Sequence, residues 1–283
     1  MDPIHNIIRS ATYYLPLYIF CGEHLLCARL RSSDRGAAHG VVEELQRIVT
    51  RLREAWPQVR ITVRGDSGFC NDELMSWCEQ EGVDYVLGLA KNERLKKRIT
   101  TEMEMVRQLQ KALGKAQRQF KEFRYQTRES WTCERRVVAK VEYLPRGENP
   151  RFIVTSVLAE ACDGRRLYED VYCARGDMEN RIKEQQLGLF ADRTSSALIQ
   201  ANQLRLYFSA FAYLMMQTLR RVGLVGTKLA RAQSWTLRLK LLKIGAQVRV
   251  TTRKVWLSFS ESYPYAALLR TVLAQVQALP LRC

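Results

Sequence analysis

The stretch that decides the fold class spans residues 59–69 and reads Val-Arg-Ile-Thr-Val-Arg-Gly-Asp-Ser-Gly-Phe. Its first half, Val59 to Val63, is rich in β-branched residues and predicts a short strand. The glycines that follow predict a turn, and a helix is expected from Asn71 through Glu81. A buried strand is expected over Val83 to Ala90, and a further helix over about 94–113. This alternation of strands and helices favours an α/β layer architecture.

The flanking sequence extends this pattern in both directions. Residues 13–31 predict a β-hairpin, and 40–56 carry an apolar stripe at helical spacing that Pro57 closes. Three strands are expected in a β-rich insertion, at 120–127, 133–144 and 152–157. Helices return from Asp177 onward, interrupted by a basic, strand-like stretch at about 247–259.

The composition is that of a folded protein with an excess of positive charge. The chain has 283 residues, a net charge of +16 and 47% hydrophobic residues, which excludes disorder as its main state. Its longest strongly apolar run, 206–216, is about half of the roughly 20 residues that a membrane span needs. No signal peptide is visible at the start. Nucleic acid or another anionic surface is the natural partner of such a chain.

Most of the positive charge lies in the last third of the chain. Residues 194–283 contain 13 basic residues against one acid, Glu261, and so carry +12 of the +16. A solvated basic face around a helical core and a phosphate-binding surface both account for this segment. The sequence alone leaves both alternatives open.

The cysteines do not form a recognisable metal site. There are eight, with no C-x-x-C pair, and the nearest approach to a cluster is Cys21, His24 and Cys27. Zinc sites usually need four ligands, so buried cysteines in a strand are the better interpretation. Scattered thiols without a secretory signal predict a cytoplasmic protein without structural metal.

Two acidic positions are candidates for catalysis. Asp66 follows a strand and stands beside glycines, a common way to present a metal ligand, although a turn or cap aspartate is the simpler alternative. The second position is Glu179, within 172–186. If that stretch is helical, five residues share one face: Tyr172, Arg175, Glu179, Lys183 and Gln186. This face is either a solvated row of ion pairs or a carboxylate ligand flanked by phosphate-binding cations.

At these residues the chain resembles bacterial insertion-sequence transposases of the DDE type. The resemblance covers about residues 13–259 and rests on the Tyr-x2-Arg-x3-Glu spacing at 172–179 and on several sequence blocks. These blocks are Tyr-Leu-Pro-Leu-Tyr-Ile-Phe-Cys-Gly at 14–22, Arg-Gly-Asp-Ser-Gly-Phe at 64–69, Met-Glu-Asn-Arg-Ile-Lys-Glu at 178–184, Leu-Phe-Ala-Asp-Arg at 189–193 and Arg-Leu-Lys-Leu-Leu-Lys-Ile-Gly-Ala at 238–246.

The resemblance implies a fold, a chemistry and a set of site residues. It implies an RNase H-like core with an Asp-Asp-Glu triad, in which Asp66 is the second carboxylate and Glu179 the third. Tyr172 and Arg175 match residues that handle transposon-end phosphates. The family's usual lysine falls at Gln186, a departure, and Lys183 is a candidate to replace it. Two divalent ions, Mg²⁺ or Mn²⁺, would serve phosphodiester cleavage and strand transfer.

The resemblance also implies a domain plan and a missing residue. The plan is a partial core (1–118), a β-rich insertion (119–160), the core helix with Glu179 (161–193) and a basic C-terminal region (194–283). The family's first Asp lies on a strand upstream of Tyr14, and residues 1–13 do not read as that strand. We therefore expect an N-terminally truncated transposase that is inactive as it stands.

The expected partner is double-stranded DNA at terminal inverted repeats, bound by a homodimer of the full-length protein, with no membrane association. The expected location is the bacterial cytoplasm, at the nucleoid. Two alternatives remain: a catalytically inactive DNA-binding remnant, and an RNase H-like metal nuclease that cuts without joining strands.

Overall fold

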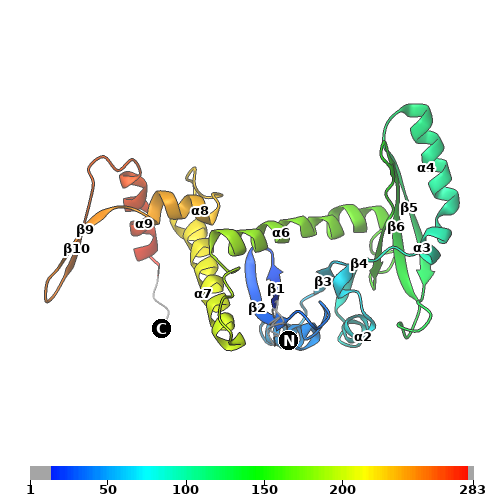
Figure 1. Ribbon diagram of the computed structural model, residues 1–283, viewed down its shortest axis with the longest axis horizontal. Coiled ribbons are helices and arrows are strands. Elements are labelled where there is room, and N and C mark those ends of the chain that lie inside the picture. The colour runs from blue at the N-terminus through cyan, green and yellow to red at the C-terminus, as the bar shows by residue number, and fades with distance from the viewer. Residues whose placement is uncertain (1–13, 280–283) are drawn as a thin grey trace, which may run out of the picture. The chain divides into compact units, whose positions relative to one another are not determined.

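The computed structural model describes residues 14–279, apart from the side chain of Arg175. The chain divides into two compact units: residues 33–177, here the sheet unit, and the rest, here the helical unit, described over 14–32 and 178–279. Both are mixtures of helices and strands, which confirms the expected α/β class (Figure 1). Within 14–279, no helix has both the length and the apolar character needed to cross a membrane.

The sheet unit is built on one mixed sheet with the strand order β3-β4-β8-β6-β5. Strands β3 (Thr62–Gly65) and β4 (Asp84–Leu89) are parallel, as expected for strands joined by a helix. The other pairings are antiparallel, through β5 (Gln117–Tyr125), β6 (Arg135–Leu144), β7 (Gly147–Glu148) and β8 (Arg151–Thr155). Strands of the expected β-rich insertion therefore continue the sheet that β3 and β4 begin. The expected division into domains stays a prediction.

The side chains of β4 alternate between the two faces of the sheet, and each face packs against a helical segment. Tyr85 points to α2 (Asp72–Gln80), where its hydroxyl donates a hydrogen bond of 2.7 Å to Glu79. Val86 points the other way and packs with Leu167 of the π-helical turn η2 (Leu167–Tyr172). All of these β4 side chains are buried, so the strand lies in the middle layer of the unit.

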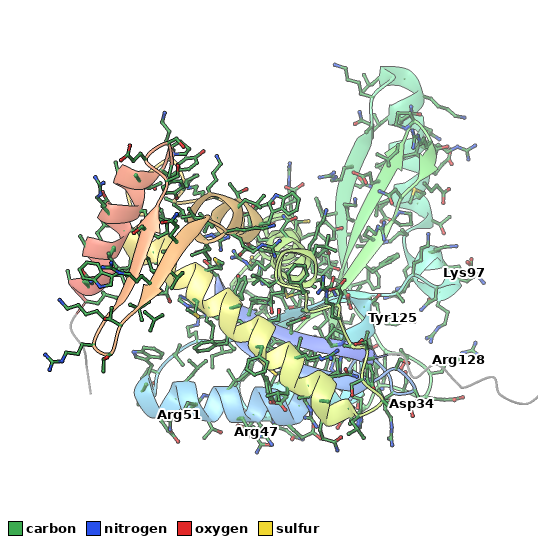
Figure 2. All side chains as sticks on the ribbon, turned by 60° about the vertical axis from the view of Figure 1, so that its left-hand side comes forward. Asp34, Arg47, Arg51, Lys97, Tyr125 and Arg128 are labelled. Atoms are coloured by element: carbon green, nitrogen blue, oxygen red, sulfur yellow. The ribbon has the colours of Figure 1, made fainter. Side chains whose placement is uncertain are left out.

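The other elements of the sheet unit follow the sequence prediction with two corrections, one to a strand and one to a helix. Helix α1 (Val41–Ala55) forms as expected, and Arg47 and Arg51 extend from its solvent face (Figure 2). The expected strand at 59–63 is displaced and β3 begins at Thr62, because the Val59 amide donates to Trp56 in the turn that ends α1. The expected helix 94–113 is two helices, α3 (Glu93–Arg98) and α4 (Thr100–Leu113), which meet at Ile99.

In the helical unit, the expected N-terminal hairpin is confirmed as β1 (Tyr14–Cys21) and β2 (His24–Ser32). Helix α7 (Ile199–Thr218) packs on it through Leu206 and Ala210, against Tyr18 and Leu30. Gln203 of α7 fixes the contact by accepting a 2.6 Å hydrogen bond from the Leu30 amide. The prediction of buried cysteines is wrong for Cys21, which is exposed where β1 ends at the turn, and Cys27 is only half-buried.

The C-terminal half of the helical unit has a second apolar core. Its elements are η5 (Leu219–Gly223), α8 (Ser234–Leu237), η6 (Arg238–Leu242) and α9 (Ala266–Gln277). Leu224, Leu237 and Val272 are among the buried side chains that hold them together. Between η6 and α9, the basic stretch expected to be strand-like forms a hairpin of β9 (Ala246–Val250) and β10 (Val255–Phe259). The segment expected to lack a strand with an Asp, residues 1–13, lies outside the described residues.

Candidate active site

Asp66 is the first residue after β3, where the sequence predicted it. It caps a short 3-10 turn, η1 (Ser67–Phe69), by accepting a 2.8 Å hydrogen bond from the Gly68 amide at Oδ1. The carboxylate is nevertheless exposed at the carboxyl end of the strand. The cap interpretation is therefore confirmed, and it is compatible with a ligand role, because a carboxylate has further acceptor positions.

The hydroxyl of Tyr172, a residue near the C-terminal end of the sheet unit's sequence, lies close to the Asp66 turn. A Cβ atom at Gly88 of β4 would lie 2.6 Å from the Tyr172 hydroxyl, 3.0 Å from the Ser67 nitrogen and 3.2 Å from the Asp66 carbonyl carbon. The tyrosine hydroxyl and the backbone of the Asp66 turn thus meet over Gly88. Only a residue without a side chain leaves room for both.

The tyrosine is held by packing and by a tether. Its ring lies 5.5 Å from that of Tyr168, between centroids, and joins the apolar cluster around Val86. Arg64 of β3 donates a 2.8 Å hydrogen bond from Nη1 to the carbonyl oxygen of Val171. The end of β3 and the helix that carries Tyr172 are therefore tied together two residues before Asp66.

The helical stretch expected at 172–186 is present, but its turns are not uniform. It runs from α5 (Gly164–Arg166) through η2, the 3-10 turn η3 (Cys173–Arg175) and α6 (Gly176–Lys183) to the π-helical turn η4 (Glu184–Gly188). Tyr172 and Arg175 belong to the sheet unit, whereas Glu179, Lys183 and Gln186 belong to the helical unit. Glu179 and Lys183 are exposed and Gln186 is half-buried. That all five share one face stays a prediction.

Glu184 anchors the helix that carries Glu179. Its carboxylate, 15% exposed, pairs with Arg220, which is 10% exposed, and accepts a hydrogen bond from the Ser234 amide. Arg220 also donates to the Ala232 carbonyl oxygen at 2.7 Å. Helices η4 and η5 and the start of α8 are joined by this one ion pair. Sequence analysis did not single out Glu184, because its partner lies 36 residues away.

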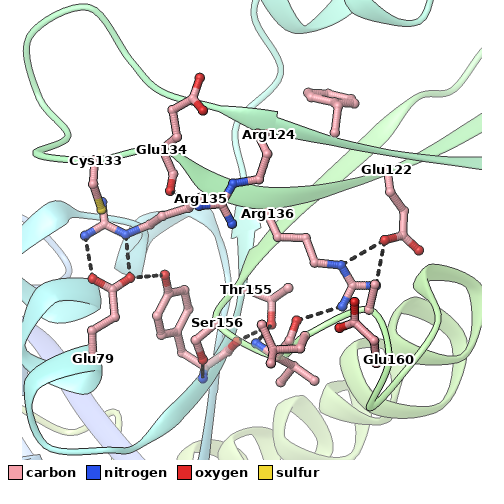
Figure 3. Close-up of a pocket in the computed structure, with 15 residues that line it drawn as sticks. Glu79, Glu122, Arg124, Cys133, Glu134, Arg135, Arg136, Thr155, Ser156 and Glu160 are labelled. Carbon is pink, nitrogen blue, oxygen red and sulfur yellow. Dashed lines mark hydrogen bonds and ion pairs between the residues drawn. The ribbon is translucent and has the colours of Figure 1, made fainter.

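A pocket in the sheet unit is lined by three arginines and four glutamates, and two of the arginines, Arg135 and Arg136, are paired with carboxylates (Figure 3). Arg135 donates to Asp72, Ser76 and Glu79, and Arg136 to Glu122 and to two backbone carbonyl oxygens. Burial alone would lower the pKa of Arg135, but its hydrogen bonds to Glu79 and Asp72 raise that pKa above the usual value. These arginines are structural and leave little for a phosphate.

The site residues that sequence analysis missed are Gly88 and Arg64. A glycine inside a strand signals close approach of another backbone or side chain, and Gly88 carried that signal within 83–90. Within 14–279, no group of three or more His, Cys, Asp or Glu residues has the geometry of a metal site. Asp66 and Glu179 belong to different units, and a cation ligated by both stays a prediction.

Comparison with known proteins identifies the family. A sequence model described as transposase DDE domain group 1 matches residues 6–281, nearly the whole chain. A comparison with curated proteins found no match. The matched range includes the Asp66 turn, Gly88 and the Tyr172–Gln186 helix. The chain belongs to the transposase DDE domain family, whose members move DNA segments by transposition.

Proposed function

We propose that this chain works at transposon ends in metal-dependent cleavage and strand transfer, with Asp66 and Glu179 as metal-binding carboxylates. The observation that carries the proposal is the meeting of the Tyr172 hydroxyl and the Asp66 turn over Gly88. It brings together Asp66 and Tyr172, which are more than 100 residues apart in the sequence, at the carboxyl end of β3. This is where α/β folds usually place a reactive site.

The proposed roles follow from residue chemistry. Two Mg²⁺ or Mn²⁺ ions bound by carboxylates would activate a water or a 3′-hydroxyl and stabilise the leaving oxygen. Asp66 supplies an exposed carboxylate on a backbone that its own cap holds in place. Tyr172 presents a hydroxyl, a suitable donor to a phosphate oxygen beside the metal site. Arg175, Lys183 and Gln186 are proposed to bind the DNA backbone.

The proposed substrate is double-stranded DNA at terminal inverted repeats, and the proposed assembly is a homodimer on that DNA, in the bacterial cytoplasm at the nucleoid. The acid-poor segment 194–283 supports the choice of substrate, because cations replace the counterions that condense on DNA. The first carboxylate of the triad is proposed to lie outside the described residues.

The test is a cleavage and strand-transfer assay with a duplex that carries the insertion-sequence end, in Mg²⁺ and in Mn²⁺. It is run on this chain and on a restored chain that is preceded by a strand carrying the first Asp, and the substitutions are made in the restored chain. Asp66→Asn keeps a side-chain oxygen that can cap Gly68 and removes the negative charge. Glu179→Gln removes the negative charge of an exposed side chain and keeps its size. We expect each to abolish both reactions. Asp170→Ala is the matched control, because this exposed carboxylate lies in the same helix, and it should retain activity.

The alternatives give different outcomes in the same assay. A chain that cuts but never joins strands is a nuclease. A chain that binds the duplex and does neither is a DNA-binding remnant. Full activity of Asp66→Asn or Glu179→Gln would show that the carboxylates are assigned wrongly.

A further inference from the structure

We propose that the polar face of the β9–β10 hairpin is a DNA-binding surface whose cations contact backbone phosphates. The inference rests on the proposed function, because it takes DNA as the partner. It names the element and the face that hold the DNA, outside the Asp66 and Glu179 region. It is drawn from the pairing register, the exposure of the side chains and the distribution of charge.

The register separates the hairpin into two faces of opposite character. Arg249 pairs with Trp256 and Gln247 with Ser258, and these four side chains share one face with Lys254 because strand residues alternate. The other face is apolar and carries Ala246, Val248, Val250, Val255, Leu257 and Phe259. Every residue of both strands is exposed, so the polar face is open to a partner.

The cations on the polar face are arranged around an aromatic ring. The Arg249 guanidinium carbon lies 6.0 Å from the centre of the Trp256 ring, and the Lys254 ammonium nitrogen lies 5.6 Å from it. Such contacts hold flexible side chains in place, which lowers the entropy lost when they bind a phosphate. Trp256 itself is 49% exposed, so its ring also offers a flat surface to sugar or base.

The tip of the hairpin is fixed by hydrogen bonds and adds a third cation. The Thr251 amide donates to the Lys254 carbonyl oxygen at 2.8 Å, and the Lys254 amide donates to the Thr251 hydroxyl at 3.2 Å. Arg253 lies in this closed turn. The three basic residues 249, 253 and 254 are therefore carried on a pre-formed ribbon, whose tip needs no ordering on binding.

Charge and size favour DNA over a protein partner for this face. Between Asp192 and Glu261 the chain has no acidic residue, and Arg238, Lys240 and Lys243 directly precede the hairpin. Strands of five residues span about 17 Å at the usual rise per residue. A two-stranded ribbon of that size fits the major groove of B-DNA, which is about 12 Å wide. A protein partner would be expected to take the apolar face instead.

The experiment measures binding of the whole chain to two duplexes, one with the insertion-sequence end and one of unrelated sequence, at several salt concentrations. The test variant is Arg249→Ala/Lys254→Ala. Arg47→Ala/Arg51→Ala on α1 removes the same charge from exposed side chains of the other unit and is the matched control (Figure 2). Arg249→Lys/Lys254→Arg keeps the charge and tests whether folding, rather than binding, is affected.

We expect the plot of log affinity against log salt to become shallower by about 2 in the test variant, because each lost phosphate contact reduces the magnitude of its negative slope by about 0.9. Affinity should fall equally on both duplexes, since phosphate contacts carry no sequence information. The α1 variant and the charge-keeping variant should retain the original slope.

The outcomes separate this inference from the proposed function. If the unaltered chain binds and joins DNA but the test variant keeps the full salt slope, the hairpin proposal is wrong and the proposed function stands. If Val248→Thr/Leu257→Thr reduces DNA binding and the test variant does not, the apolar face is the contact surface and the proposal is wrong. If the unaltered chain binds neither duplex, the proposed function fails with it.

Discussion

At the scale of single residues, Gly88 places the tightest demand on the candidate site. Its neighbours are a hydroxyl and two backbone atoms, and backbone cannot move aside as the end of a long side chain can. The glycine is buried inside β4 and lies opposite Ile153 of β8. Position 88 therefore controls the spacing between Tyr172 and the Asp66 turn without offering any functional group.

We expect Gly88→Ala to displace Tyr172 and to lower strand transfer, with a loss of stability of roughly 1–3 kcal/mol from overpacking. Adding Tyr172→Phe removes the atom at 2.6 Å and should recover part of the stability but not the activity. Thermal unfolding and strand transfer measure the two effects. Gly36→Ala is the control, because nothing lies within 4 Å of its added carbon. Equal behaviour of the two alanine variants would contradict this account.

Sequence reasoning succeeded at the residue scale where the determinant is local. Asp66 and Asn71 were placed correctly because turn and cap signals act over a few residues, and Asn71 does cap α2 through a 3.0 Å bond to the Leu74 amide. Gly88 and Arg64 were missed because their partners, Tyr172 and Val171, lie far along the chain. The amino-acid sequence contains both residues, but their roles arise only after the sheet forms.

At the scale of elements, the Glu184–Arg220 pair decides how the Glu179 helix ends. The two side chains are largely buried and are surrounded by η4, η5 and α8. Arg220 has a second bond, to the Ala232 carbonyl, and Arg238 adds a bond of 3.2 Å to the Gly188 carbonyl. These two arginines therefore link η4, η5, η6 and the start of α8.

Glu184→Gln is expected to destabilise the chain by about 3–5 kcal/mol, because it leaves the Arg220 charge buried without its counterion. The measurement is chemical unfolding followed by circular dichroism. Glu93→Gln is the control: its pair with Lys96 is exposed, and such pairs contribute at most about 1 kcal/mol. A similar loss in both variants would show that the burial of Glu184 is unimportant.

Element prediction failed where periodicity carries no information about breaks or pairing. The apolar pattern continues across Ile99, so 94–113 reads as one helix although the helix is interrupted there. In the same way, strand patterns at 133–144 and 152–157 do not say that β8 pairs with both β4 and β6. Alternation in 247–259 predicted strands, and the register was needed to assign their faces.

At the scale of the whole molecule, the carboxyl groups that make stability depend on acidic pH lie in the sheet unit. Glu142, whose side chain is 6% exposed, accepts hydrogen bonds from Lys140, Arg118 and Asn149. Burial alone would raise its pKa, but these bonds outweigh it and lower the pKa from 4.5 to about 2. Partial desolvation alone would also raise the pKa values of Asp72 and Glu79, but hydrogen bonds that include those from Arg135 lower both.

A carboxyl group whose pKa is lowered by folding stabilises the protein at pH values above its pKa in the unfolded chain. This stabilisation is lost as the pH falls through its pKa in the folded chain. We therefore expect the free energy of unfolding to decrease between about pH 5 and pH 2, with Glu142 contributing about 3 kcal/mol. Glu142→Gln should be less stable at pH 7 and should show a shallower decrease on acidification. Parallel curves for the variant and the unaltered chain would count against this role.

The hairpin has a consequence for how the protein behaves in solution. Both of its strands have an open edge, and its apolar face is exposed, which are features of aggregation-prone segments. Arg249, Arg253 and Lys254 oppose association, because like charges keep the ribbons of different molecules apart. If the same cations bind phosphates, partial neutralisation by DNA removes this repulsion. The protein is then least soluble at intermediate DNA-to-protein ratios, and most soluble when DNA is absent or in excess.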